Sequence, residues 1–195
     1  MHSGNPYRSS WLLRLLLLMS VIGWPSVAAT EPGGSPGYGV QPGDILQISV
    51  WKEPDLQLEV LVRPDGGISL PLAGDIAARG QTVEALRAEI VSRIEKYIPE
   101  PVVTVSVKEI RGNNIYVIGK VNRPGVFVLT QDIDVMQALS MAGGTTTFAA
   151  LNKIVILRRD GGGQTAITFR YAEVEGGSKL EQNILLRNGD VVVVP

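Results

Sequence analysis

Apolar and polar side chains alternate in several short stretches of this chain, and a period of two predicts β-strands. Residues 44–51 alternate in the manner of a half-buried strand, and residues 101–107 form a strongly β-branched stretch. Residues 59–63 and 68–70 are two further extended pieces, separated by Pro64-Asp65-Gly66-Gly67, a sequence typical of tight turns. We therefore expect residues 60–62 and 68–70 to pair as a hairpin.

A helical period replaces the alternation over residues 82–97. Thr82 can cap the first turn, Glu84 suits its positive end, and Pro99 prevents continuation. The spacings of three and four predict one apolar stripe, made of Val83, Leu86, Ile90, Ile94 and Tyr97. With the strands on either side, this helix predicts a first α+β domain over residues 38–110.

Arg111-Gly112-Asn113-Asn114 interrupts the pattern and marks a domain boundary. Residues 115–119 and 126–129 then predict a hairpin around Pro124-Gly125. A helix is expected over residues 134–142, because Asp134 and Gln137 have capping-box spacing and Gly143-Gly144 can end it. Strands at 154–157, 166–169 and 190–194 complete the order. Hairpin, helix, hairpin and last strand is the order of a β-grasp (ubiquitin-like) fold, so residues 111–195 are predicted to be a second domain and the fold class is α+β.

Two turns share a pattern. Pro42-Gly43-Asp44 and Asn188-Gly189-Asp190 each deliver an apolar strand. The simpler interpretation is one turn signal used twice; the alternative is that both ends of the chain contribute strands of similar shape.

The N-terminus predicts secretion. Arg8 and Arg14 flank the start of an apolar run over residues 15–24, and Val27-Ala28-Ala29 offers the small residues that a signal peptidase recognises. The run is about half of the roughly 20 residues needed to span a bilayer. We expect a signal peptide over residues 1–29 and a flexible Gly/Pro-rich leader over residues 30–37, with an uncleaved anchor as the alternative.

Composition narrows the functional classes. Cleavage after Ala29 leaves 166 of the 195 residues and removes the single histidine, His2, and two arginines, so the formal net charge falls from −1 to −3. No basic cluster longer than Arg158-Arg159 remains, so no nucleic-acid partner is expected. Cysteine is absent, which excludes disulfides, thiol nucleophiles and thiolate metal ligands.

Catalysis is not expected, and neither a catalytic residue, a cofactor-binding residue nor a metal ligand is assigned. Glycoside hydrolysis by two carboxylates stays formally open, with Asp44, Asp55, Asp65 and Asp75 as candidates by residue type. Three of these lie beside glycine in turns, where Asp commonly caps local backbone donors. A calcium site from Asp65, Asp75 and backbone carbonyls is a weaker alternative, because no dense acidic loop supports it.

Proteins commonly bind sugars through aromatic side chains, and this chain has few aromatic residues after the predicted signal peptide. Trp51 lies at a strand end and is a candidate lip residue. Most of the aromatic residues after residue 37 lie within strand or helix patterns, and these are expected in the core. The full set of aromatic residues in this part of the chain is Tyr38, Trp51, Tyr97, Tyr116, Phe127, Phe148, Phe169 and Tyr171.

The turn motifs occur in a characteristic order. They are Tyr38-Gly39-Val40-Gln41-Pro42-Gly43-Asp44, Arg63-Pro64-Asp65-Gly66-Gly67-Ile68-Ser69-Leu70-Pro71, Gly119-Lys120-Val121-Asn122-Arg123-Pro124-Gly125 and Ala142-Gly143-Gly144. In this order and at these distances they resemble the bacterial polysaccharide export proteins (the Wza-like family), in which a small export (PES-type) domain precedes a soluble-ligand-binding β-grasp (SLBB) domain. The resemblance covers about residues 38–195.

The resemblance implies a homo-oligomeric ring whose wide polar lumen conducts a polysaccharide without covalent chemistry. The motif residues are then architectural, setting turns and strand ends rather than touching substrate: Pro42, Gly43, Asp44, Asp65, Gly66, Pro71, Gly74, Gly80, Pro124, Gly125, Gly143 and Gly144.

Two departures from the family refine this expectation. Many members are lipoproteins acylated on a cysteine, which this chain lacks. Members that cross the outer membrane carry a second β-grasp domain and a C-terminal amphipathic helix, whereas this sequence stops at Pro195. We expect a short periplasmic member that needs a separate outer-membrane pore protein, or that docks onto an inner-membrane polysaccharide co-polymerase of the tyrosine-kinase-like kind.

Three functional hypotheses remain. The first is a periplasmic exopolysaccharide export subunit. The second is a monomeric periplasmic β-grasp module that binds a small sugar-like ligand or a cofactor. The third is a carboxylate-dependent periplasmic enzyme.

Overall fold

The computed structural model describes residues 37–195, so the predicted signal peptide and nearly all of the predicted leader lie outside the described residues. Buried hydrophobic side chains form two separate cores. One core is built from residues between Val40 and Val103, and the other from residues between Ile115 and Val194. None of the helices in this part of the chain has the length and hydropathy needed to cross a bilayer.

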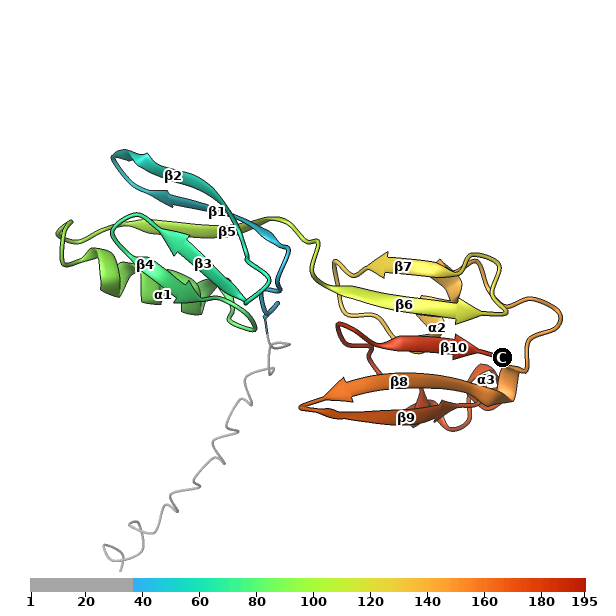
Figure 1. Ribbon diagram of the computed structural model, residues 1–195. Helices are drawn as coiled ribbons and strands as arrows, with labels where there is room; N and C mark the ends of the chain where they lie inside the picture. The colour runs from blue at the N-terminus through green and yellow to red at the C-terminus, as the bar shows by residue number, and fades with distance from the viewer. Residues whose placement is uncertain (1–36) are drawn as a thin grey trace, which may run out of the picture. The chain divides into compact units, whose positions relative to one another are not determined.

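The first core lies under a three-stranded antiparallel sheet of order β2-β1-β5. It consists of β1 (Ile45–Val50), β2 (Glu53–Leu61) and β5 (Val103–Glu109). The helix α1 (Val83–Ile94) packs on one face of this sheet, as Figure 1 shows. The alternation in β1 buries Leu46, Ile48 and Val50 toward the helix. Pro54 is accommodated within β2 because this strand is at the edge of the sheet.

The helix prediction is confirmed with one correction. The Thr82 side chain caps α1 by accepting a hydrogen bond from the backbone N–H of Ala85 at 3.2 Å, and Leu86, Ile90 and Ile94 are buried. The helix ends at Ile94, however, so Tyr97 is not part of the apolar stripe and is 63% exposed. The chain turns there, with the N–H of Tyr97 donating to the carbonyl of Ile94 at 2.8 Å.

The predicted hairpin between residues 60–62 and 68–70 is wrong. β2 pairs with β1, while β3 (Gly67–Leu70) pairs with β4 (Gly74–Ala77), a strand that was not predicted. A turn over residues 71–73 sends the chain straight back, and Gly74 adopts the left-handed φ of 69° that ends this turn. Strand β4 is short and contains Gly and Asp, so its local β-propensity was too weak to reveal it.

The second core lies under a five-stranded sheet of order β7-β6-β10-β8-β9. The strands are β6 (Asn114–Gly119), β7 (Gly125–Val128), β8 (Ile154–Asp160), β9 (Gly163–Phe169) and β10 (Val191–Val194). Strand β10 is parallel to β6 and antiparallel to β8. Both predicted hairpins, the β-grasp order and the α+β class are confirmed.

One face of this sheet is covered by α2 (Val135–Met141) and α3 (Tyr171–Glu175), which lie behind the strands in Figure 1. The capping box of α2 is confirmed: the carboxylate of Asp134 accepts from the N–H of Gln137 at 2.8 Å, and the Gln137 side chain accepts from the N–H of Asp134 at 2.9 Å. The helix α3 and the 3₁₀ turns η1 (Leu151–Lys153) and η2 (Leu180–Gln182) were not predicted. They are too short to show a helical period.

Candidate functional site

The structure brings together only two of the four candidate carboxylates. Asp44 is fully buried at the start of β1, and Asp55 is exposed on β2. Only Asp65 and Asp75 come together, and both contact one guanidinium group, that of Arg63.

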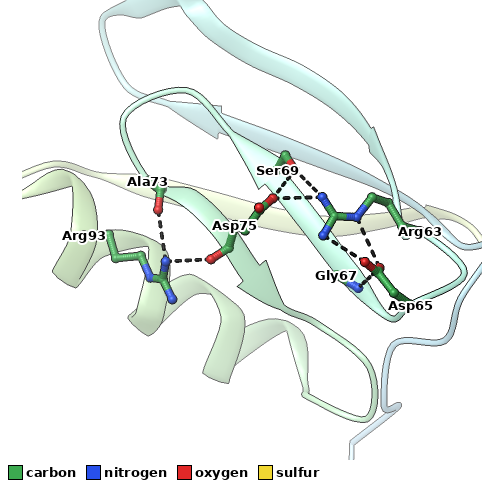
Figure 2. Close-up of polar contacts among 7 residues, drawn as sticks. All are labelled: Arg63, Asp65, Gly67, Ser69, Ala73, Asp75 and Arg93. Atoms are coloured by element: carbon green, nitrogen blue, oxygen red, sulfur yellow. Dashed lines mark hydrogen bonds and ion pairs between the residues drawn. The ribbon is translucent and has the colours of Figure 1, made fainter.

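Arg63 is the centre of a polar cluster on the β3–β4 hairpin (Figure 2). Its Nε donates to Asp65 Oδ1 at 3.1 Å, and one terminal nitrogen donates to Asp75 Oδ1 at 2.8 Å and to Ser69 Oγ at 2.6 Å. Asp65 also accepts from the backbone N–H of Gly67 at 2.9 Å, and the Ser69 hydroxyl donates to Asp75. We call these five residues the Arg63 cluster. All of its charged groups have partners.

The cluster also reaches α1. Arg93 donates from one terminal nitrogen to the carbonyl of Asp75 at 2.7 Å and to the carbonyl of Ala73 at 3.1 Å, as Figure 2 shows. Its other terminal nitrogen pairs with Glu89 one helical turn earlier, at 2.6 Å. The hairpin is therefore held to the end of β2 by Arg63 and to the helix by Arg93.

The pKa shifts of the two carboxylates in the Arg63 cluster do not suit general acid–base catalysis. The pKa of Asp65 is lowered first by the hydrogen bond from Gly67 and then by Arg63. The pKa of Asp75 is lowered first by the hydrogen bond from Ser69 and then by Arg63. Carboxylate-based glycoside hydrolysis needs one carboxyl with a raised pKa that can give up a proton. Two carboxylates held ionised by the same arginine do not form such a pair.

The cluster borders an open cleft of about 240 Å³, in which Asp65 and Asp75 present charge to solvent. Two carboxylates are too few for a protein calcium site unless other oxygens join them. No group of three acidic, histidine or cysteine side chains that could hold a metal ion occurs within residues 37–195. The Arg63 cluster is therefore better described as a structural clamp, which holds the β3–β4 hairpin in place, than as a metal site.

We expect Arg63→Gln to raise the pKa of both Asp65 and Asp75 toward the ordinary Asp value of about 3.9. A carboxylate with a lowered folded-state pKa stabilises the fold above its unfolded-state pKa, and this contribution is lost as pH falls through the folded-state pKa. The stability advantage of the wild-type protein over Arg63→Gln should therefore shrink in acid. Carboxyl-carbon NMR titrations check the shift, with Arg87→Gln on the exposed face of α1 as control; unchanged titrations in Arg63→Gln would contradict the clamp.

Asp44 is the centre of a second set of polar contacts. Its Oδ2 accepts from the Tyr38 hydroxyl at 2.5 Å and from the N–H of Gln41 at 2.8 Å. Its Oδ1 accepts from the N–H groups of Arg111 and Gly112, at 2.9 and 2.8 Å. Burial, and then the hydrogen bond to Asp44, raise the pKa of Tyr38 well above its usual range. One carboxylate thus ties residues 38–41 to the segment that follows β5.

Asp190 occupies the corresponding place before β10. Its two oxygens accept from Nε and a terminal nitrogen of Arg158, at 3.0 and 2.7 Å, and Oδ2 also accepts from the N–H of Arg187 at 2.8 Å. The side chains of Arg158 and Asp190 are only 10% and 1% exposed. Asp190 raises the pKa of Arg158 through this hydrogen bond. The pairing of Arg158 was not predicted, because nothing local to Arg158 indicates a partner 32 residues away.

Beyond these clusters, the two sheets present contrasting outer faces. The five-stranded sheet is largely apolar on the face that points away from α2, because β7, β6, β10 and most of β8 carry apolar residues on that side, whereas Arg159 of β8 and Gln164 of β9 are polar. We call this surface the outer apolar face; it comprises Tyr116, Ile118, Val126, Val128, Val155, Leu157, Val191 and Val193.

The strand register makes the outer apolar face continuous. Tyr116 lies beside Val126 on one side and Val191 on the other, and Val191 lies beside Leu157. Ile118 is 46% exposed and Val126 is 59% exposed. The four consecutive valines of β10 were the sequence signal for this surface, since strands with apolar residues on both faces are typical of sheets covered on both sides.

The three-stranded sheet has a polar outer face. Most of its outward side chains are polar, namely Gln47, Ser49, Asp55, Gln57, Glu59, Thr104, Ser106 and Lys108, while Ile45 and Leu61 form an apolar pair at one end of the same face. Lys108 and Glu59 form an ion pair on it. We call this surface the outer polar face.

The expectation that most aromatic residues lie in the core is wrong for three of them. Phe169 is fully buried, whereas the following are exposed by 63%, 40% and 81% respectively: Tyr97, Tyr116 and Phe148. Trp51, the candidate lip residue at a strand end, is 70% exposed. Strand and helix patterns locate a residue within an element, but they do not tell which face of the element is covered.

The sequence is similar to two protein-family models in succession. Residues 33–108 match the model described as polysaccharide biosynthesis/export protein, and residues 114–168 match the SLBB domain.

Characterised relatives carry related names. The EPS I polysaccharide export outer membrane protein EpsA of Ralstonia nicotianae is 32% identical, covering 80% of this chain and 47% of the relative. The capsule polysaccharide export protein BexD of Haemophilus influenzae is 26% identical, covering 82% and 44%. The capsule polysaccharide export outer membrane protein CtrA of Neisseria meningitidis is 27% identical, covering 78% and 43%. The chain spans about half the length of these relatives.

Proposed function

We propose that the chain is a periplasmic subunit of an exopolysaccharide or capsule export complex, because it matches the polysaccharide biosynthesis/export protein model over residues 33–108 and the SLBB domain over residues 114–168. In this proposal residues 38–110 are the export domain and residues 111–195 the SLBB domain. Several copies assemble into a ring, and the polysaccharide passes through its lumen toward the cell surface.

The outer apolar face is the observation that carries this proposal. A sheet face with apolar side chains on four adjacent strands is costly to leave in water, and large contiguous patches of this kind mark interaction surfaces. A ring subunit needs such a surface to contact its neighbour. The outer polar face supports the second requirement of a conduit, a hydrated lining.

The mechanism that we propose is conduction without bond cleavage. The sequence lacks cysteine, and its single histidine is His2. The two carboxylates that do meet are held ionised by Arg63. The protein then acts through shape and surface polarity, and we expect it to have no enzymatic activity and to need no cofactor.

The partners follow from the same proposal. The substrate is a polysaccharide, an inner-membrane co-polymerase of the tyrosine-kinase-like kind delivers it, and a separate outer-membrane pore protein can complete the route. A signal peptide over residues 1–29 would place the protein in the periplasm without a lipid anchor, since no cysteine is present for acylation.

A monomeric module that binds a small sugar-like ligand is the second candidate. One observation favours it: a cavity of about 310 Å³ lies between the end of α2 and α3, lined by Met136, Gly143, Tyr171 and neighbouring residues. A protein that stays monomeric at all concentrations would support this candidate over a ring.

Deleting the gene is expected to abolish or strongly reduce polysaccharide secretion, and the wild-type gene should restore it. Ile118→Glu with Val128→Glu should fail to restore secretion, because two carboxylates on the outer apolar face cannot be desolvated at a subunit contact. Light scattering after size-exclusion chromatography should show a smaller assembly for this variant.

The control keeps the charge change and moves it elsewhere. Ala88→Glu with Ser92→Glu adds the same two charges to the exposed face of α1 and should leave the assembly unchanged. Circular dichroism verifies that each variant is folded. Normal secretion by the deletion strain would contradict the export proposal. An unaltered assembly in the Ile118/Val128 variant would show that the outer apolar face is not the contact between subunits.

A further inference from the structure

Trp51 is the largest apolar side chain exposed on the first domain, and it lies at the edge of the outer polar face. Its exposed fraction is 70%. It borders an open cavity of about 330 Å³ that is lined by both apolar and hydrogen-bonding side chains: Ser49, Val50, Lys52, Gln57, Val102 and Thr104. An exposed indole combines a large apolar face with an N–H donor, and side chains of this kind are enriched at binding interfaces.

The backbone holds this indole in a defined place. Trp51 and Lys52 form the tight turn between β1 and β2, in which Val50 pairs with Glu53. The N–H of Trp51 donates to the carbonyl of Val102 at 2.9 Å, and Lys52 adopts a left-handed φ of 66°. A lysine in this conformation is strained, and such strain is found where position matters.

The hydrogen-bonding groups come from three neighbouring strands. Ser49 of β1 pairs in register with Thr104 of β5, and Gln57 lies on the adjacent β2. Each presents a neutral donor and acceptor outward. Together they form a short row of hydroxyl and amide groups beside the indole.

We propose that Trp51 and this cavity form a contact site for the sugar rings of the transported polysaccharide, an inference that rests on the proposed export function. The C–H face of a sugar ring packs on an aromatic ring, while its hydroxyls exchange hydrogen bonds with Ser49, Gln57 and Thr104. Because the cavity is open, the contact is weak and water competes for it. Weak contact suits a conduit, since a tightly held polymer would not advance.

A protein partner fits this surface less well. The central part of a stable protein interface is apolar and depleted in charge. The cavity beside Trp51 includes the apolar side chains of Val50 and Val102, but the ammonium group of Lys52 and the hydroxyl and amide groups of Ser49, Gln57 and Thr104 also line it. Of the two outer faces described above, the outer apolar face has the composition closer to that of a protein interface.

The sequence provides a direct probe of this site. Only three tryptophans are present, and Trp11 and Trp24 both precede residue 37. In the full chain carrying Trp11→Phe and Trp24→Phe, all indole fluorescence comes from Trp51. The titrant is a mixture of short oligosaccharides, cut with mild acid from the polymer that the complemented strain secretes. We expect a blue shift of the emission and reduced quenching by acrylamide.

Substitutions test the contact by calorimetry with the same oligosaccharides. Trp51→Ala should bind about tenfold more weakly, and Trp51→Phe should retain part of the affinity because it keeps an aromatic face. Tyr97→Ala removes an exposed aromatic residue that does not line this cavity, and it should bind as the wild type does.

The outcomes separate this inference from the export proposal. Trp51→Ala is expected to lower secretion while its assembly, measured by light scattering, is unchanged. If the deletion strain is defective but Trp51→Ala secretes and binds like wild type, this inference fails and the export proposal stands. If Trp51 becomes shielded from acrylamide as protein concentration rises without oligosaccharide, the surface is a contact between copies, and the inference is overturned.

Discussion

Asp190→Asn is expected to lower the free energy of unfolding of the β-grasp part by about 4 kcal/mol, since removing one partner of a buried ion pair leaves an uncompensated charge. The carboxylate receives two nitrogens of Arg158 and the N–H of Arg187. An amide accepts through one oxygen only, and its NH₂ group would face a donor. Amide hydrogen exchange in β8 and β10 measures the loss.

Two further variants make the result interpretable. Asp160→Asn removes an exposed carboxylate 3.7 Å from Arg187, and such surface pairs contribute less than about 1 kcal/mol. Replacing Arg158 by Met together with Asp190 by Leu removes both charges and should recover part of the stability. If Asp190→Asn cost no more than Asp160→Asn, the buried pair would not be holding β10 in place.

The second large effect is expected for Asp44→Asn, which should lower the free energy of unfolding of the first domain by about 3 kcal/mol. Four donors converge on this buried carboxylate, two on each oxygen. An asparagine keeps one acceptor and places an NH₂ group against the other two donors. Either the N–H groups of Arg111 and Gly112, or the Tyr38 hydroxyl and the N–H group of Gln41, then lose their acceptor.

Trp51 fluorescence during urea denaturation reports on this domain, in the background of Trp11→Phe and Trp24→Phe. Asp55→Asn on the exposed side of β2 is the matched control and should unfold with the wild type. Tyr38→Phe removes a single hydrogen bond and should cost about 1 kcal/mol. A midpoint for Asp44→Asn equal to that of Asp55→Asn would show that the four contacts contribute little.

The two aspartates also resolve the repeated turn seen in the sequence. In both turns the Asp carboxylate accepts from the N–H three residues earlier, and the preceding glycine has a left-handed φ, of 98° at Gly43 and 87° at Gly189. The interpretation as one turn signal used twice is therefore sufficient. The remaining partners differ, backbone N–H groups and Tyr38 for Asp44 and a guanidinium for Asp190, and no local pattern distinguishes these two cases.

What the sequence determined by itself is local. Periodicity located α1 and most strands, the capping residues Thr82 and Asp134 marked helix starts, and the order of elements predicted the β-grasp sheet. These features depend on residues within a few positions of one another, so they can be read along the chain. The order of the turn motifs was enough to suggest the family.

Only the tertiary structure decided which segments meet. Strand β3 pairs with β4 and not with β2, Arg158 reaches Asp190, and Asp65 and Asp75 share Arg63. Exposure was also undecided, because an apolar strand has the same sequence whether a second layer covers its outer face or not. Pairing and burial depend on contacts between residues far apart in the chain, and for this reason the outer apolar face became visible only in three dimensions.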